Sequence, residues 1–173
     1  MSQNPFDQIR ILVTGGTIDK TYSPVEGVLG FSRTHVLAML RQGGVEVPES
    51  QIETVLLKDS LEMTDADRDT VLRACASAEE PRLLITHGTD TMILTAARLA
   101  HANLGKAVVL VGAMVPYTFS NSDGLFNLGC AFAALQLVVP GVYICMNGRV
   151  FPWDKVRKNR QAGRFEDLRP SQP

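Results

Sequence analysis

Two threonines and one aspartate, each close to a glycine in a short polar segment, are the side chains of this sequence best suited to chemistry. Thr89 and Asp90 follow a short apolar run within Leu83–Met92, and Thr17 follows a pair of glycines within Thr14–Ile18. A threonine hydroxyl is a weak nucleophile until a nearby base removes its proton. Hydroxyls, a carboxylate and a base gathered in one pocket would form an acyl-transfer centre.

The base is expected to be a lysine, because neither threonine lies at the chain's N-terminus, where a terminal amine would serve. A lysine in a dry site can be neutral enough to accept a proton, with Asp90 to orient it. Residue types alone do not choose among the candidates, which are Lys58, Lys106 and Lys158. The backbone N–H groups of Gly16 and Gly88 are expected to stabilise a developing oxyanion.

Each of these residues also has an ordinary structural interpretation. Thr89 and Asp90 precede a helical segment, where such residues commonly cap the helix N-terminus. Thr17 would serve as a turn residue, and Ser60 would be a loop residue after its strand. Tyr22 would pack its own loop against the rest of the chain.

The elements that must position these residues alternate between strand and helix. Apolar runs predict strands at Ile9–Val13, Thr54–Leu57, Leu83–Ile85, Ala107–Val111 and Val142–Met146. Helical periodicity and end signals predict helices at Thr34–Arg41, Thr64–Ala78, from Thr91 to about Asn103, and at Leu125–Val138. This order predicts an α/β fold in which a mainly parallel β-sheet has helices on both faces.

Four of the predicted strands end in polar or glycine-containing turns. The turns are Thr14–Thr17, Asp59–Glu62, Thr86–Thr91 and Gly112–Pro116. The carboxyl ends of parallel strands lie at one edge of a sheet, which is where open α/β sheets bind ligands. The residues expected to face one pocket are therefore Thr17, Ser60, Thr89 and Asp90.

Two segments lack this periodicity. Asp19–Phe31 is polar and contains glycine and proline, so it is expected to be a long loop that carries Tyr22 and acts as a lid. Asn147–Pro173 is rich in arginine and lysine, and a solvated basic tail is its ordinary interpretation.

Composition limits the classes of function. The chain has 173 residues, enough for one domain with a real core, and its formal net charge of −1 gives no reason to expect binding to nucleic acid or membrane. The first residues are polar and contain no apolar signal-peptide core. The cysteines, Cys75, Cys130 and Cys145, lack metal-ligand spacing, so reduced buried thiols in a cytoplasmic protein are expected, with no metal and no cofactor.

Three motifs together resemble those of a known family. TGGTI at Thr14–Ile18, THGTDTM at Thr86–Met92, and GAM followed by SDG and FNL within Gly112–Leu128 resemble the bacterial-type asparaginase/glutaminase family. The resemblance covers almost the whole chain and keeps the order of the motifs. It implies an enzyme that deamidates L-asparagine, or a related small amide, to the acid and ammonia through a threonine acyl-enzyme.

The resemblance also implies roles for individual residues. Thr17 matches the nucleophile of the first loop, and Tyr22 is similar to the tyrosine that assists it. Thr89 and Asp90 match the second threonine and its aspartate. The family's lysine lies in a V-x-K pattern, which Val156–Lys158 fits, and so the resemblance selects Lys158. Ser60 matches the residue that binds the substrate's α-carboxylate and α-amino groups together with Asp90, beside the backbone of Gly16 and Gly88.

The chain departs from the family pattern in three ways. Val115 stands where arginine is usual, and Leu61 stands where glutamine is usual. Most members carry a second, smaller C-terminal domain that closes the site of a neighbouring subunit. Residues 1–173 resemble the N-terminal domain, without a C-terminal domain, so either a short-form member or the N-terminal domain alone is expected.

Other functions remain open at this point. A non-catalytic amino-acid-binding or regulatory domain is the alternative to the enzyme, and a subunit of a larger amidotransferase is a third. The resemblance implies that copies of the chain assemble into a homodimer or homotetramer.

Overall fold

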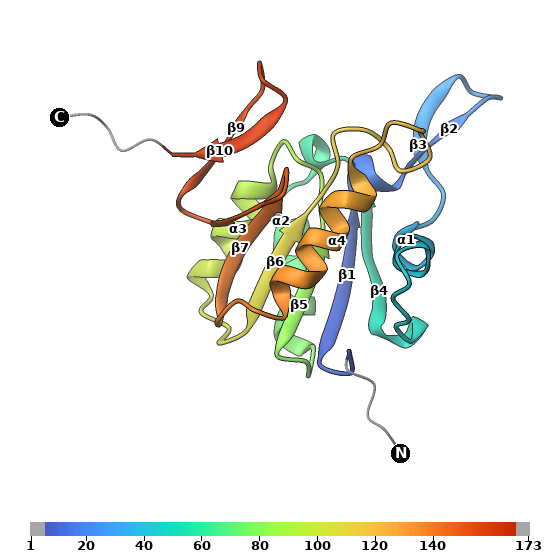
Figure 1. Cartoon of the computed structure of the whole chain (residues 1–173). Helices are drawn as coiled ribbons and strands as arrows, with labels where there is room; N and C mark the ends of the chain where they lie inside the picture. The colour runs from blue at the N-terminus through green and yellow to red at the C-terminus, as the bar shows by residue number, and fades with distance from the viewer. Residues whose placement is uncertain (1–5, 169–173) are drawn as a thin grey trace.

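A six-stranded sheet forms the centre of the computed structural model, which describes residues 6–168 (Figure 1). Its strand order is β4-β1-β5-β6-β7-β8. The strands are β1 (Ile9–Gly15), β4 (Ile52–Lys58), β5 (Arg82–Thr86), β6 (Ala107–Val111), β7 (Gly141–Met146) and β8 (Arg149–Pro152). All neighbouring pairs are parallel except β7 and β8, which are antiparallel.

Helices cover both faces of this sheet (Figure 1). Helices α1 (Val36–Gln42) and α4 (Gly124–Leu135) pack on one face, and α2 (Asp65–Ser77) and α3 (Met92–His101) pack on the other. Successive side chains of β1 point to opposite faces of the sheet and so enter both hydrophobic cores. Ile11 faces α1 and α4, and Leu12 faces α2 and α3. The predicted fold class is therefore confirmed.

Local sequence signals explain where these elements begin and end. All five residues of β6 are buried, as expected for a β-branched strand with helices on both sides. Thr64 caps α2 through a reciprocal capping box, in which the Thr64 hydroxyl accepts from Asp67 N at 3.2 Å and the Asp67 carboxylate accepts from Thr64 N at 2.8 Å. Three short 3₁₀ helices, η1 (Thr17–Asp19), η2 (Glu49–Gln51) and η3 (Ser60–Glu62), complete the connections.

The expected long loop at Asp19–Phe31 is instead a β-hairpin, so that expectation is wrong. Strands β2 (Lys20–Ser23) and β3 (Val28–Phe31) pair antiparallel. Gly27 closes the turn with a φ of 69° and donates its N–H to the Ser23 carbonyl at 2.8 Å. The hairpin projects from the end of the sheet where the parallel strands finish (Figure 1).

The segment after Asn147 is not a solvated tail within the described residues. After β8, strands β9 (Val156–Asn159) and β10 (Arg164–Asp167) form a second hairpin at the same end of the sheet (Figure 1). Its buried side chains, Val156 and Phe165, join the core beside α2 and α3. Charged neighbours hide this pattern in the sequence, and the last five residues of the expected tail lie outside the described range.

The cysteines within residues 6–168 are all free, and Cys75 and Cys145 are buried. Burial raises the pKa of each of these two thiols to about 12. Among the helices of residues 6–168, none is long and apolar enough to span a membrane.

We predict that Phe165→Ala destabilises the domain by about 3 kcal/mol, because it removes a fully buried ring and leaves a cavity under β9. Chemical denaturation measures the free energy of unfolding. The matched control is Arg164→Ala at an exposed position of the same strand, which should change that free energy by no more than about 0.5 kcal/mol. Equal effects of the two substitutions would contradict the anchoring of the hairpin through Phe165.

Candidate active site

The turns after β1, β5 and β4 touch one another through their backbones. A Cβ atom added to Gly16 would lie 2.3 Å from Gly88 N, and one added to Gly88 would lie 2.6 Å from Ser60 Oγ. Gly16 also has a φ of 80°, a conformation that side chains disfavour. Thr17 and Thr89, each directly after one of these glycines, therefore lie on adjoining turns beside Ser60.

Lys158 contacts the second of these threonines and its aspartate. Its Nζ lies 2.7 Å from Thr89 Oγ1 and 3.0 Å from Asp90 Oδ1, and only 11% of its side chain is exposed. The other two lysine candidates have different partners. Lys58 pairs with Asp67 at 2.9 Å, and Lys106 donates to the backbone carbonyls of Cys75 and Ala78.

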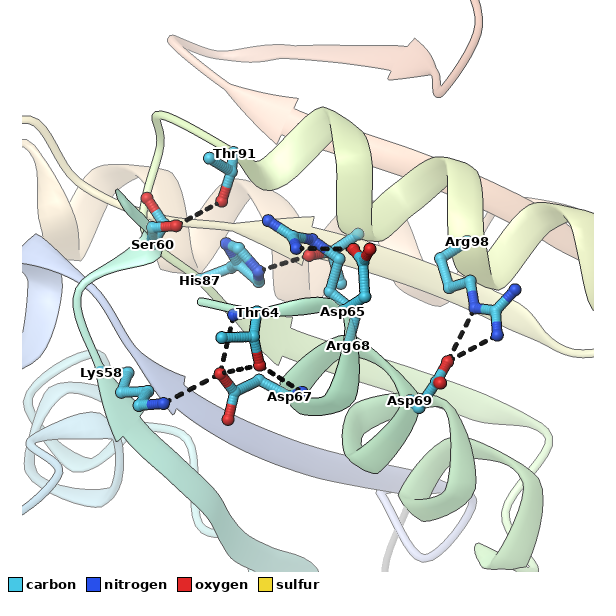
Figure 2. A network of polar contacts seen from close by, with 11 residues as sticks. Lys58, Ser60, Thr64, Asp65, Asp67, Arg68, Asp69, His87, Thr91 and Arg98 are labelled. Carbon is cyan, nitrogen blue, oxygen red and sulfur yellow. Dashed lines mark hydrogen bonds and ion pairs between the residues drawn. The ribbon is translucent and has the colours of Figure 1, made fainter. Parts of the chain in front are cut away.

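Helix capping does not account for Thr89 and Asp90. The N-cap residue of α3 is Thr91, and its hydroxyl donates to the Ser60 carbonyl at 2.7 Å instead of capping the helix (Figure 2). The Thr91 contact ties the turn after β5 to the turn after β4. Lys158 is the partner that Thr89 and Asp90 share.

Two hydroxyls beside this cluster are unpaired within residues 6–168. Neither Thr17 Oγ1 nor Ser60 Oγ makes a hydrogen bond with a described residue, although Ser60 is 99% buried. Thr17 is half-buried at the start of η1. A free hydroxyl at each position can therefore meet a ligand without first breaking a protein contact.

Tyr22 lies apart from the other predicted site residues. It lies on β2, its side chain is 52% exposed, and it lines a shallow surface depression with Thr118 and Phe119. Strand alternation places Tyr22 on the same side of β2 as Lys20, which faces the turn after β4.

Lys20 and Asp59 form an ion pair that the sequence did not reveal. Their closest atoms are 2.5 Å apart, and the pair joins β2 to the turn after β4. Burial alone would raise the pKa of the Asp59 carboxyl. Hydrogen bonds from Lys20 and Leu61 N, together with the positive charges of Lys20 and Lys158, outweigh burial and lower that pKa.

His87 is buried beneath the turn that carries Thr89 (Figure 2). Its Nδ1 lies 2.8 Å from the Gly88 carbonyl, and its Nε2 lies 2.8 Å from Thr95 Oγ1. Burial lowers the pKa of His87 to about 4; the Gly88 hydrogen bond opposes this shift and the positive charge of Arg68 adds to it. Because the C=O and N–H of one peptide point in opposite directions, this contact aims the N–H of Thr89 away from the imidazole.

The amide groups differ in their availability to an oxyanion. Gly16 N already donates to the Lys58 carbonyl at 2.9 Å. No described residue accepts a hydrogen bond from Gly88 N. Gly16 therefore contributes to the site by letting its backbone lie close to that of Gly88.

Hydrogen bonds with Asp123, the N-cap residue of α4, and with Asn127 on α4 hold the turn after β6 in place. This turn adds no reactive side chain to the site. The Asp123 carboxylate accepts from Met114 N at 2.9 Å and from Val115 N at 3.0 Å. Asn127 donates to the Gly112 carbonyl at 3.1 Å and accepts from Asn147 N at 3.1 Å. These contacts connect the turn to the segment that leads to the β9–β10 hairpin.

Residues 8–166 match the family model described as "Asparaginase, N-terminal". The chain belongs to the asparaginase family. The matched span includes all the predicted site residues, from Gly16 to Lys158.

Several asparaginases are similar to this chain. The L-asparaginase of Thermococcus kodakarensis is 29% identical over 163 residues, which cover 90% of this chain and 49% of that protein. L-asparaginase 1 of Escherichia coli K12 is 30% identical over 166 residues, covering 90% and 48%. The chain therefore spans about half the length of the curated relatives it matches.

Solved structures show the same relationship. The thermostable L-asparaginase from Thermococcus kodakarensis superposes with a TM-score of 0.79 at 30% identity, covering 92% of this chain and 51% of that chain. A probable cytoplasmic L-asparaginase from Campylobacter jejuni superposes with a TM-score of 0.73 at 28% identity, covering 92% and 52%. The sheet and its helices are thus those of an asparaginase N-terminal half.

We predict that His87 stays neutral in the folded protein down to about pH 4, whereas an ordinary histidine titrates near pH 6.5. The unfolded chain binds more protons between these two values, so the free energy of unfolding should fall by up to about 3 kcal/mol as the pH drops from 6.5 to 4. NMR titration of the imidazole and denaturation at several pH values measure both effects. His87→Gln should flatten the stability profile, and titration of His87 near pH 6.5 would contradict the prediction.

Proposed function

We propose that this chain is an amidohydrolase that deamidates L-asparagine, or a related small amide, through a threonine acyl-enzyme. The observation that carries the proposal is the contact of Lys158 Nζ with both Thr89 and Asp90, on the turn that touches the turn of Thr17. Family membership supports the same chemistry, because two relatives that each cover 90% of this chain are named L-asparaginase and L-asparaginase 1.

In this mechanism Thr17 Oγ1 attacks the side-chain amide carbon of the substrate. The N–H groups of the turn at Gly88 stabilise the oxyanion. The proton of Thr17 Oγ1 passes to the amide nitrogen, the C–N bond breaks, and ammonia leaves as the ester on Thr17 forms. Water then attacks the ester, and one of its protons passes to the pair formed by Thr89 and Lys158, which Asp90 holds in place. The acid leaves as the ester bond breaks, and that proton returns to Thr17 Oγ1. Tyr22 assists Thr17 once the β2–β3 hairpin has closed over the substrate.

The substrate's α-groups lie between Ser60 and Asp90. Ser60 Oγ is unpaired within the described range and can donate to a carboxylate. No described residue donates a hydrogen bond to Asp90 Oδ2, so that oxygen can accept one from an ammonium group. The reaction uses no cofactor and no metal.

The enzyme acts in the cytoplasm as a homodimer or homotetramer. The similarity to a probable cytoplasmic L-asparaginase supports the location. Exposed apolar side chains on and after α4, Phe126, Leu137 and Val139, support the assembly. Light scattering should give a mass of at least two chains of 18.9 kDa, and a single-chain mass would contradict this part of the proposal.

We predict that Thr17→Ala, Thr89→Val and Lys158→Met each lower ammonia release from L-asparagine by at least about 100-fold. The reason is that Thr17→Ala removes the nucleophile, and each of the other two substitutions removes a group that takes or passes a proton. A coupled ammonia assay with L-asparagine, L-glutamine and simple amides measures the effect. Lys155→Met is the matched control, because that side chain is 69% exposed on the same segment.

The control should retain wild-type activity. Full activity in both threonine variants would rule out the mechanism. Binding of L-asparagine without turnover, measured by calorimetry on the wild-type protein, would favour a binding or regulatory domain over an enzyme.

A further inference from the structure

Arg160 places a second cation beside Asp90. It lies in the turn between β9 and β10, and its Nη2 is 3.1 Å from Asp90 Oδ1. The same oxygen accepts from Lys158 Nζ at 3.0 Å. The Arg160 side chain is 68% exposed and that of Lys158 only 11%, so Lys158 lies inside the site and Arg160 at its rim.

The contact of Arg160 uses little of its hydrogen-bonding capacity. Arg157 holds Glu166 through two nitrogens, Nε at 3.0 Å and Nη2 at 2.6 Å. The closest approach of Arg160 to Asp90 is 3.1 Å, and this ion pair is not among the hydrogen bonds between described residues. A guanidinium has five N–H donors in a planar fork that matches a carboxylate, so most of the Arg160 fork is unused.

Two other cationic side chains near this edge of the sheet already form ion pairs. Lys20 pairs with Asp59 at 2.5 Å, and Lys58 pairs with Asp67 at 2.9 Å. Ser60 offers a neutral hydroxyl. Among the described residues, Arg160 is therefore the charged donor beside Asp90 that has capacity to bind an anionic group.

We propose that Arg160 binds the α-carboxylate of the substrate and thereby selects amides that carry one. The inference rests on the proposed function. When the substrate enters, the pair between Asp90 and Arg160 opens, Asp90 takes the α-ammonium group and Arg160 takes the α-carboxylate. One exposed ion pair is exchanged for two, and because exposed pairs contribute little to stability, opening the first costs little.

Three amides that differ by one group test this assignment. L-Asparagine carries both α-groups, succinamate lacks the ammonium group, and 3-aminopropanamide lacks the carboxylate. The variant is Arg160→Gln. The matched control is Arg164→Gln, which removes an arginine that is 64% exposed and lies on the other side of the same hairpin, near Glu166.

The expected result is a split between substrates. Arg160→Gln should raise KM about tenfold or more for L-asparagine and succinamate, with kcat within about twofold, because a charge-assisted hydrogen bond to the carboxylate is lost. KM for 3-aminopropanamide should stay unchanged. Arg164→Gln should change none of these values, and both variants should keep the wild-type Tm.

Other outcomes would overturn the inference. An equal change for all three substrates would make Arg160 a structural residue. A lower KM for L-asparagine in Arg160→Gln would mean that Arg160 only competes with the ammonium group for Asp90.

Calorimetry separates failure of this inference from failure of the proposed function. If the wild-type protein releases no ammonia, the proposed activity fails, and the ligands become L-aspartate, succinate and 3-aminopropanoate. Weaker binding of the first two by Arg160→Gln, with binding of the third unchanged, would still support the carboxylate site. Unchanged affinities, or no binding of any of the three by the wild-type protein, would overturn it.

Discussion

The position of the Lys158 ammonium group is the constraint on which the candidate site depends. Lys158 belongs to a hairpin that is not part of the central sheet, yet it must reach Thr89 and Asp90 on the turn after β5. Burial of Phe165 and its backbone hydrogen bond to Asn147 hold the hairpin there. Lys158 Nζ is 3.0 Å from Asp90 Oδ1, and this contact holds the nearly buried amine beside Thr89.

The second constraint is the absence of side chains where the strand ends meet. Gly16 and Gly88 allow three turns to touch through backbone atoms, which no larger residue would permit. This packing sets the two threonines on adjoining turns and leaves the hydroxyls of Thr17 and Ser60 without protein partners in residues 6–168. Buried His87 then fixes the peptide that precedes Thr89.

The five parallel strands and the helices were predictable from sequence because their signals are local, as in the apolar run Ala107–Val111. The sixth strand, β8, lies among charged residues and was not predicted. The site was only partly predictable. Residue types left three lysines equivalent, and the family motif rather than spacing selected Lys158. Two ion pairs join residues far apart in the chain, so no local sequence pattern predicts them. They are the pairs of Lys20 with Asp59 and of Arg160 with Asp90.

The most direct test of the account is the location of the covalent intermediate. Thr89→Val should slow hydrolysis of the ester more than its formation. Rapid quenching with L-asparagine, followed by mass spectrometry of the peptides, should therefore find one aspartyl group attached to Thr17. An aspartyl group on another residue, or no adduct in the variant of an enzyme whose wild-type form releases ammonia, would contradict the central claim.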